Sequence, residues 1–156
     1  MKKRILIIIA MVAVLICALA IPSFAQEQGD IVILYENDVH CEIFGYLSLS
    51  AMRNELKQEY EHVGIVSSGD FLQGGSLGSI SKGEYIVKLM NKVGYDAIAL
   101  GNHEFDWGED PIEENAELAE FPLLAINIYD AETNRQVSYC ESSTMVDLGQ
   151  VQIGII

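Results

Sequence analysis

Basic residues are scarce in this sequence. Its 156 residues include 9 lysines and arginines against 23 aspartates and glutamates, a formal balance of −14. A surface with so little positive charge repels nucleic-acid phosphates and anionic membranes. We therefore exclude nucleic acid as a partner, and we expect no membrane contact beyond an export signal.

Cysteine and histidine are also few. The chain has three of each, and no histidine follows His103. Cys41 and Cys140 remain once the apolar start of the chain is set aside, and a disulfide between them is permitted only in an oxidising compartment. Two unpaired buried thiols are an equally good interpretation. No internal repeat, low-complexity tract or linker is present, and the length suits one domain.

The first 25 residues have the composition of a secretory leader. A basic start (Met-Lys-Lys-Arg) precedes an apolar run from Ile5 to Ile21, and Ser23 and Ala25 supply the small residues of a cleavage site. An uncleaved membrane anchor is the alternative, although the run is at the short limit of the roughly 20 residues that a spanning helix needs. The pattern favours cleavage after Ala25 and a secreted, periplasmic or cell-surface protein that begins near Gln26.

Removing this leader makes the chain more acidic. Three basic residues and no acidic residue are lost, which leaves 6 basic and 23 acidic residues and a balance of −17. Carboxylates are the ligands that hard or borderline cations bind. Bound divalent cations would be the largest charges in their surroundings, so a small anionic substrate remains compatible with this acidic surface.

The hydrophobic pattern predicts alternating strands and helices. Short apolar runs at 31–35, 63–66, 96–100 and 122–126 are typical of buried strands, and 144–148 and 151–156 favour two more around Gly149-Gln150. Helices are expected over 46–60, after Ser81 and up to Gly94, and from Asp110-Pro111 to about 120. This order predicts an α/β fold with a mainly parallel sheet and flanking helices.

Several local features accompany these elements. Ser81 and Glu84 have capping-box spacing, and Asp110 stands where a helix cap would precede Pro111. In the helix over 46–60 we expect Leu49, Met52, Leu56 and Tyr60 to face the core. His62 is expected at the surface. The last strand stops at the final residue with no turn after it, so we expect the chain to be the N-terminal part of a longer domain.

Polar residues follow the first three predicted strands. Asp38 and His40 follow the first strand, Asp70 follows the second, and Asn102 and His103 follow the third. In an open α/β sheet, ligands bind at the carboxyl ends of the strands. These side chains are therefore expected to converge although they lie far apart in the sequence.

The residue types suit a site for two divalent metal ions. Asp38 and His40 are two residues apart, so in an extended chain their side chains point the same way. Asp70 has two oxygens with which to bridge two cations, and Asn102 offers a neutral oxygen to the second. Mixed oxygen and nitrogen ligands favour Zn, Mn or Fe over Mg or Ca alone. Two cations about 4 Å apart hold a hydroxide and a phosphoryl oxygen for in-line attack.

His103 and Asp106 complete this set as a catalytic pair. His103 need not bind metal and is placed to donate a proton to a leaving group, while Asp106 is placed to hold its imidazole in one tautomer. Gly69 and Gly101 allow tight turns beside the metals. We interpret Phe105 and Trp107 as core residues. The acidic run 109–120 is interpreted as a solvated helix face.

These motifs resemble the calcineurin-like metallophosphoesterases, and within them the secreted 5′-nucleotidase branch. The similarity runs through Asn37-Asp-Val-His40, Ser68-Gly-Asp-Phe-Leu-Gln-Gly74 and Gly101-Asn-His-Glu-Phe-Asp-Trp-Gly108. It implies Asp38, His40 and Asp70 at one metal and Asp70 and Asn102 at the other, with His103 and Asp106 as the catalytic dyad. Family members take further ligands from later in the domain and hold the nucleoside in a separate C-terminal domain. Residues 26–156 therefore correspond to the N-terminal part only.

The resemblance implies a metal-dependent phosphoester hydrolase acting on nucleotides, of the 5′-nucleotidase, cyclic-nucleotide phosphodiesterase or nucleotide-sugar hydrolase type. Two alternatives stay open: a related hydrolase of sulfur-linked groups, and a catalytically inactive fragment or interaction module. The sequence departs from the family at Cys41, where glycine is frequent. A thiol there is able to coordinate the metal or to oxidise.

Overall fold

The computed structural model describes residues 29–156, and the predicted leader over 1–25 lies outside them. The expectation that the leader is cleaved therefore stays a prediction. Within the described part of the chain, no helix combines the length and the apolar character that a membrane crossing needs.

A four-stranded parallel sheet forms the centre of the fold, with its strands side by side in chain order. The strands are β1 (Ile31–Glu36), β2 (His62–Ser67), β3 (Ala97–Ala99) and β4 (Leu123–Leu124). β1 and β2 pair along their whole length, whereas β3 and β4 are shorter than the apolar runs predicted. The predicted α/β class with a mainly parallel sheet is confirmed.

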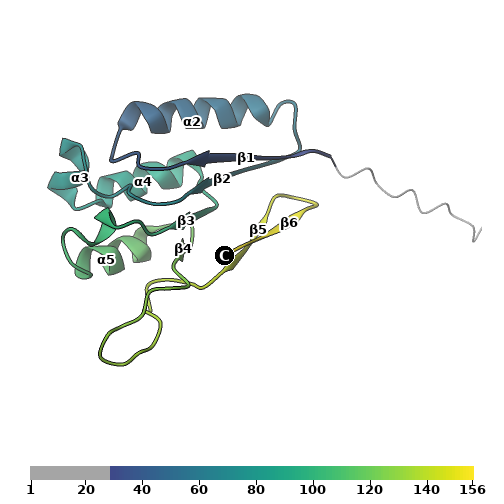
Figure 1. The fold of residues 1–156 in the computed structure, drawn as a ribbon. Coiled ribbons are helices and arrows are strands. Elements are labelled where there is room, and N and C mark those ends of the chain that lie inside the picture. Colours follow the sequence, from purple (N-terminus) through teal and green to yellow (C-terminus); the bar gives the residue numbers. More distant parts are fainter. Residues whose placement is uncertain (1–28) are drawn as a thin grey trace, which may run out of the picture.

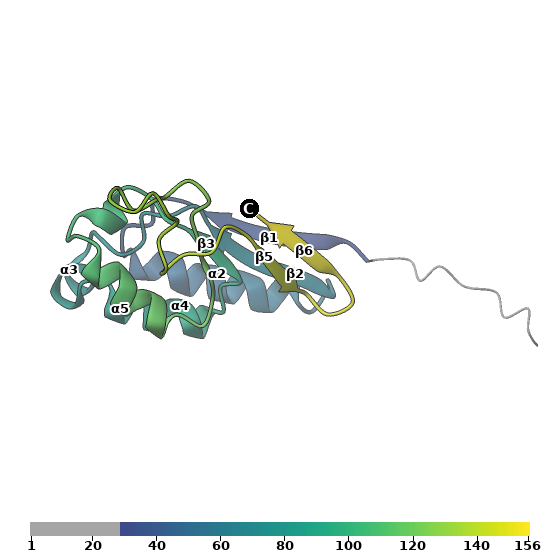
Figure 2. The ribbon, with the colours of Figure 1, turned by 90° about the horizontal axis from the view of Figure 1, so that it is seen from below.

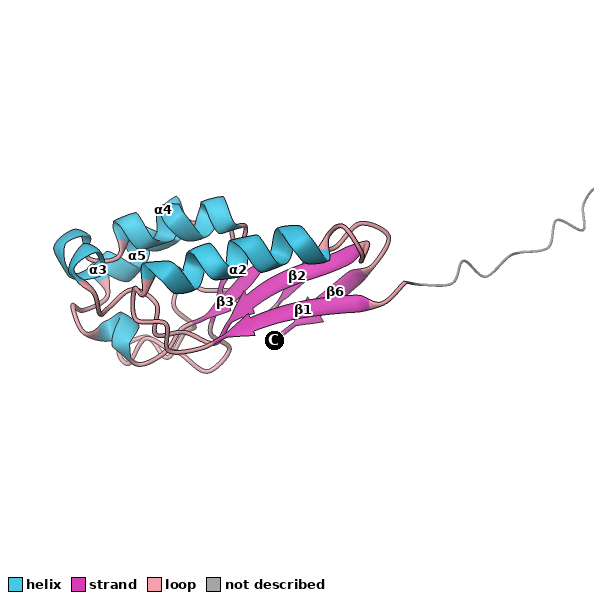
Figure 3. Cartoon of the chain, turned by 90° about the horizontal axis from the view of Figure 1, so that it is seen from above, coloured by secondary structure: helices cyan, strands magenta, loops and turns pink. Residues whose placement is uncertain are grey.

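Helices connect consecutive strands and cover one face of the sheet (Figures 1 and 3). They are α2 (Ile43–Leu56), α3 (Ser76–Ser81), α4 (Glu84–Val93) and α5 (Asp110–Leu118), with a short 3₁₀ turn η1 (His103–Phe105) before α5. α4 contacts both α2 and α5. Ile86 and Met90 of α4 pack there against Ile65 and Ile98 of the sheet, and all four are almost fully buried.

A β-hairpin packs against the opposite face. β5 (Thr144–Asp147) and β6 (Gln152–Ile155) pair antiparallel around the predicted turn, at the end of the molecule away from α3 (Figure 2). Ala97 and Leu124 contact Val146 and Leu148 of the hairpin segment, whereas Ile98 packs with the helices. Successive strand residues point to opposite faces, so each short strand contributes to both layers.

The first helix differs from its prediction in position and in orientation. It occupies Ile43–Leu56, where Glu42 accepts a hydrogen bond from the Phe44 amide, and the chain continues beyond it in tight turns. Met52 is 50% exposed. Arg53 turns inward instead and donates to the Val93 carbonyl at 2.9 Å. Arg53, whose hydrogen-bond acceptor is the buried Val93 carbonyl, therefore takes the place on the buried face of this helix that was predicted for Met52.

Neither predicted residue stands at the helix cap itself, although Ser81 Oγ accepts a hydrogen bond from the Tyr85 amide at 3.2 Å, in the first turn of α4. Gly83, in the left-handed region at φ +94, stands at the cap of α4, and Ser81 ends the separate helix α3. Asp110 is the first residue of α5, which has no side-chain cap. The Cβ that any other residue would add at position 83 would collide with Leu72, so this close approach requires glycine.

His62 is buried, contrary to the prediction. It begins β2 with 2% of its surface exposed, and its Nδ1 lies 2.8 Å from the carbonyl oxygen of Leu148. That nitrogen donates to the carbonyl and links the sheet to the hairpin. The contact joins residues 86 positions apart, which local sequence patterns do not reveal.

Candidate metal centre

The loop after β1 carries the first two candidate ligands. Asp38 Oδ1 and His40 Nε2 lie 3.6 Å apart. The segment is a turn and not the extended chain predicted, because both residues have positive φ, 54° and 47°. The two side chains converge, as predicted, by a different backbone path.

Hydrogen bonding leaves one nitrogen of His40 open. Its Nδ1 lies 3.2 Å from the carbonyl oxygen of Gln73, which only accepts hydrogen bonds. Nδ1 therefore carries the proton, and the lone pair is on Nε2, the atom beside Asp38. A second-sphere carbonyl of this kind fixes the tautomer that metal-binding histidines use.

Asp70 follows β2 and lies within reach of both residues. The ligand atoms of Asp38, His40 and Asp70 all lie within 4.8 Å of one another. Asp70 is 9% exposed, and its Oδ1 accepts a hydrogen bond from the backbone N–H of His103 at 2.9 Å. The carboxylate thus connects the second strand end to the third.

The backbone around these ligands is strained. Asp38, His40, Cys41 and Asp70 all have φ between 47° and 63°, a region that residues other than glycine seldom adopt. Such residues cluster at functional sites and persist where neighbouring contacts hold them. Here the His40 amide donates to the Asp70 carbonyl at 2.9 Å and the Gly75 amide to the His40 carbonyl at 3.1 Å.

His103 and Asp106 form the expected pair. His103 Nδ1 lies 2.9 Å from Asp106 Oδ2, and both side chains are 38% exposed. The hydrogen bond to Asp106 raises the pKa of His103 above its ordinary value, against a smaller opposing effect of desolvation. The rings of His103 and His40 meet edge to face with centroids 5.0 Å apart, so the pair stands beside the candidate ligands.

Glu104 is an organising residue that the sequence interpretation missed. It is fully buried, and its carboxylate accepts four backbone N–H groups: those of Asp70 at 2.8 Å, Phe71 at 2.8 Å, Leu72 at 3.1 Å and Gly101 at 2.7 Å. One side chain therefore fixes the loops after β2 and β3 relative to each other. Its only sequence signal is its place directly after His103.

The two glycines of these loops meet. A Cβ at Gly69, where φ is +107, would collide with the backbone of Gly101, and a Cβ at Gly101 would collide with Asp70. Both positions thus need glycine because two backbones approach closely. The predicted tight turn is found at Gly69, whereas Gly101 needs glycine because of the close approach to Asp70.

Cys41 points away from the candidate ligands. Its buried Sγ donates to the carbonyls of Phe71 and Leu72 at 3.1 Å each. Burial raises the pKa of the thiol to about 11, with a further contribution from Glu104. A protonated thiol is neither the nucleophile nor the metal-binding form of cysteine. Cys41 and Cys140 are both free and buried.

The remaining residues of the third strand end lie around this centre. Asn102 is exposed and precedes η1, and no contact of its side chain supports or opposes its predicted role as a ligand. Phe105 and Trp107 pack against the hydrophobic core, as predicted.

The donor atoms suit a divalent cation. Two carboxylates and one imidazole nitrogen gather at one edge of the sheet, and mixed oxygen and nitrogen sets bind Zn, Mn and Fe. In residues 29–156 no other three carboxylate, thiol or imidazole groups are grouped so closely. The described residues thus fit one cation directly, and Asp70 has a second oxygen for another.

Comparison with known proteins identifies related sequences and folds. The family model described as calcineurin-like phosphoesterase matches residues 31–144. A snake venom 5′-nucleotidase from Gloydius brevicauda is 33% identical over 86% of this chain and 26% of its own length. A 5′-nucleotidase from Vibrio vulnificus is 30% identical over 100% of this chain and 31% of its own length. The chain therefore spans less than a third of these relatives.

A solved structure has the same fold. The 5′-nucleotidase precursor from Thermus thermophilus superposes with a TM-score of 0.72 at 23% identity, over 81% of this chain and 28% of that one. The superposition covers the N-terminal part of a longer polypeptide. At this level of identity the superposition shows the likeness of the fold.

Proposed function

This chain belongs to the calcineurin-like phosphoesterase family, and from that premise we propose that the complete protein is a metal-dependent hydrolase of nucleotide phosphoesters. The observation that carries the proposal is the grouping of Asp38, His40 and Asp70 within 4.8 Å, beside the His103–Asp106 pair. The relatives named as 5′-nucleotidases support nucleotides as the substrate class.

Each ligand has a defined part in this proposal. His40 offers Nε2 because Gln73 holds its other nitrogen. Asp38 and Asp70 would offer carboxylate oxygens to one cation, and the second oxygen of Asp70 together with Asn102 would help to hold another. Divalent cations at these positions would polarise a phosphoryl oxygen and lower the pKa of an attacking water.

His103 supplies the proton chemistry. Asp106 accepts the hydrogen bond from Nδ1, which leaves Nε2 to face the substrate. The raised pKa of His103 keeps more of the imidazole protonated near neutral pH. In that form Nε2 donates a hydrogen bond to the negative oxygens of a phosphate, or a proton to the departing oxygen.

Hydrolysis by the complete gene product tests this function. We expect phosphate release from nucleoside 5′-monophosphates to require divalent metal and to be lost on chelation. Asp70→Asn should abolish it, because a neutral amide is a poor bridge between cations. Asp110→Asn, which removes one exposed acid elsewhere, should leave it unchanged. Equal activity before and after chelation, or in Asp70→Asn and the parent, would refute the proposal.

We also propose that the protein is exported. The support is the leader pattern over residues 1–25, together with the similarity to a nucleotidase found in a snake venom. N-terminal sequencing of the protein recovered outside the cytoplasm should begin at Gln26. Recovery only in the cytoplasm with Met1 intact would contradict export.

A further inference from the structure

The candidate metal ligands differ in how firmly the protein holds them. Asp70 is nearly buried and accepts the backbone N–H of His103, and His40 donates its Nδ1 proton to the Gln73 carbonyl. The side chain of Asp38 is 54% exposed, and within residues 29–156 no backbone group donates a hydrogen bond to its carboxylate. Neighbouring side chains are therefore left to orient Asp38.

Asn37 supplies a partner for Asp38. Its Nδ2 donates a hydrogen bond to Asp38 Oδ2, while Asp38 Oδ1 is the oxygen that lies 3.6 Å from His40 Nε2. Holding Oδ2 turns Oδ1 toward the lone pair of the imidazole, so both donor atoms face the position of a bound cation. Outer partners of this kind orient metal-binding carboxylates, and their loss typically costs about 10–100-fold in metal affinity.

Hydrogen bonds on both sides fix the orientation of the Asn37 amide. A carboxylate that binds a cation is ionised and only accepts, so the NH₂ group faces Asp38. The amide oxygen of Asn37 then faces Ser68 and accepts a hydrogen bond from Ser68 Oγ. Because that bond uses the only proton of the Ser68 hydroxyl, the Tyr35 hydroxyl, 3.0 Å away, donates to Ser68 Oγ. Every donor in this series points toward Asp38, and hydrogen bonds arranged in this way strengthen one another.

Strand pairing brings these side chains together. β1 and β2 are parallel and in register as far as the pair of Glu36 and Ser67, so Asn37 and Ser68 are the next residues along the two chains. The Ser68 amide donates to the Glu36 carbonyl at 3.2 Å and continues the pairing by one step. The backbone therefore holds Asn37 beside Ser68 whether or not a cation is bound.

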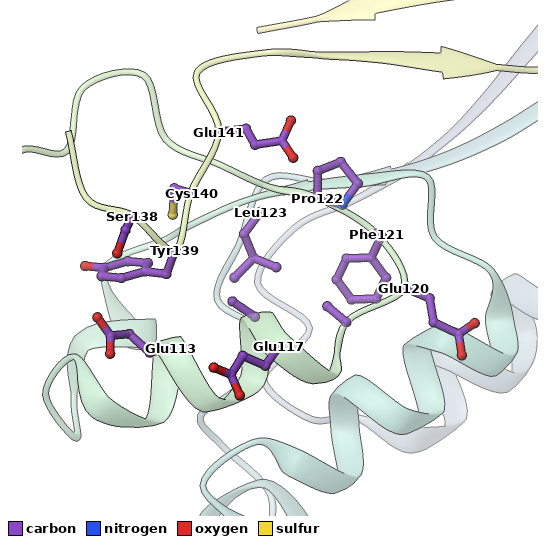
Figure 4. A pocket seen from close by; sticks show the side chains of 12 residues that line it. Glu113, Glu117, Glu120, Phe121, Pro122, Leu123, Ser138, Tyr139, Cys140 and Glu141 are labelled. Carbon is purple, nitrogen blue, oxygen red and sulfur yellow. The ribbon is translucent and has the colours of Figure 1, made fainter.

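A cavity of about 600 Å³ lies outside this arrangement. It is bounded by α5, by the segment leading into β4 and by residues 138–141 (Figure 4). Among residues 29–156, no hydrogen bond or ion pair connects its lining residues to Asp38 or Asn37. The orientation of Asp38 therefore depends on the ends of β1 and β2 and on nothing in that cavity.

We propose that Asn37 is the positioning residue for Asp38, and that Ser68 and Tyr35 fix the orientation of its amide. The inference rests on the proposed metal site and adds to it side chains that bind no cation themselves. Without Asn37, the Asp38 carboxylate turns freely, so a cation has to order it on binding. The loss appears as weaker cation binding and not as a less stable fold, because Asn37 and Asp38 are both exposed.

Equilibrium dialysis of the full chain against Mn²⁺ tests the role of Asn37. Asn37→Ala should bind Mn²⁺ about tenfold more weakly than the parent. Asn54→Ala makes the same change at an exposed site on α2 and should bind with the affinity of the parent. Without metal, all three proteins should unfold at the same urea concentration.

The outcomes separate this inference from the proposed function. If the parent and Asn37→Ala bound Mn²⁺ equally well, the positioning role would be wrong and the metal site would stand. If the parent bound no Mn²⁺, both would be wrong. Earlier unfolding of Asn37→Ala in urea would show a structural role for Asn37 and would also overturn the inference.

Two further measurements test how the side chains act. The visible absorption bands of bound Co²⁺ follow the geometry of its ligands, so at saturation they should shift in Asn37→Ala and stay unchanged in Asn54→Ala; unchanged bands in both would contradict the positioning role. Ser68→Ala and Tyr35→Phe should each weaken Mn²⁺ binding less than Asn37→Ala does. The double variant Asn37→Ala/Ser68→Ala should bind no more weakly than Asn37→Ala, because Ser68 acts only through Asn37. Additive losses would show that Ser68 acts independently, and the proposed series would be wrong.

Discussion

Glu104→Gln should destabilise the protein more than any exposed charge change of the same kind. The carboxylate accepts two backbone N–H groups on each oxygen: Phe71 and Leu72 on Oε1, Asp70 and Gly101 on Oε2. Glutamine has nearly the same shape but replaces one oxygen with an NH₂ group that cannot accept. Two buried donors therefore lose their acceptor whichever way the amide is turned.

The magnitude follows from those two donors. A buried group left without its partner costs about 1–3 kcal/mol, so the substitution should lower the free energy of unfolding by about 2–6 kcal/mol. A domain has about 5–15 kcal/mol in total, so this loss is a large fraction. The same donors position Asp70 and Gly101, so the affinity for divalent cations should fall as well.

Urea unfolding of the chain measures this effect, with Glu114→Gln on the exposed side of α5 as the matched control. The control should change the free energy of unfolding by less than about 0.5 kcal/mol, as is usual for surface substitutions. If Glu104→Gln unfolded at the same urea concentration as the control, the four hydrogen bonds would not hold the two loops. The reasoning about Glu104 would then be refuted.

Two further predictions concern pH. Burial raises the pKa of Glu36 above its ordinary value, so its contribution to stability is present below the unfolded-state pKa and is lost as pH rises through the folded-state pKa. Thermal-denaturation midpoints should therefore fall over this pH range, and Glu36→Gln should make the fall shallower. An unchanged pH dependence in the variant would contradict this prediction. Asp106→Asn removes the main cause of the raised pKa of His103. The alkaline limb of the pH profile of kcat/KM for the complete protein should therefore move to lower pH. A limb that does not move would exclude His103 as the proton donor.

The sheet was predictable because its strands are short apolar runs bounded by polar residues. Buried parallel strands lack alternation, and the continuous run at 63–66 identifies β2 directly. The run at 31–35 also forms a strand, but the prediction that it is buried is wrong, because Ile31, Ile33 and Tyr35 of β1 are exposed. The order of ligands at strand ends followed from the same pattern. Asp38, His40 and Asp70 could be grouped because the carboxyl ends of parallel strands share one edge.

What the sequence did not reveal depends on distant contacts. His62 is buried where its Nδ1 donates a hydrogen bond to the Leu148 carbonyl, and Arg53 turns inward where its guanidinium donates a hydrogen bond to the Val93 carbonyl. Glu104 is organised by donors from loops more than 30 residues away. Local spacing also misplaced the cap of α4, because the positive φ at position 83 and the close Leu72 side chain favour glycine there. Each of these contacts appears only when segments far apart in sequence are brought together.

Cation binding tests the central claim that Asp38, His40 and Asp70 form a metal centre. Equilibrium dialysis of the chain against Mn²⁺ and Zn²⁺, with the parent, Asp70→Asn and Asp110→Asn compared side by side, measures it directly. The parent and Asp110→Asn should bind at least one cation per chain with equal affinity, and Asp70→Asn should bind about tenfold more weakly or less. If Asp70→Asn bound as tightly as the parent, or if the parent bound no cation, the account of this site would be wrong.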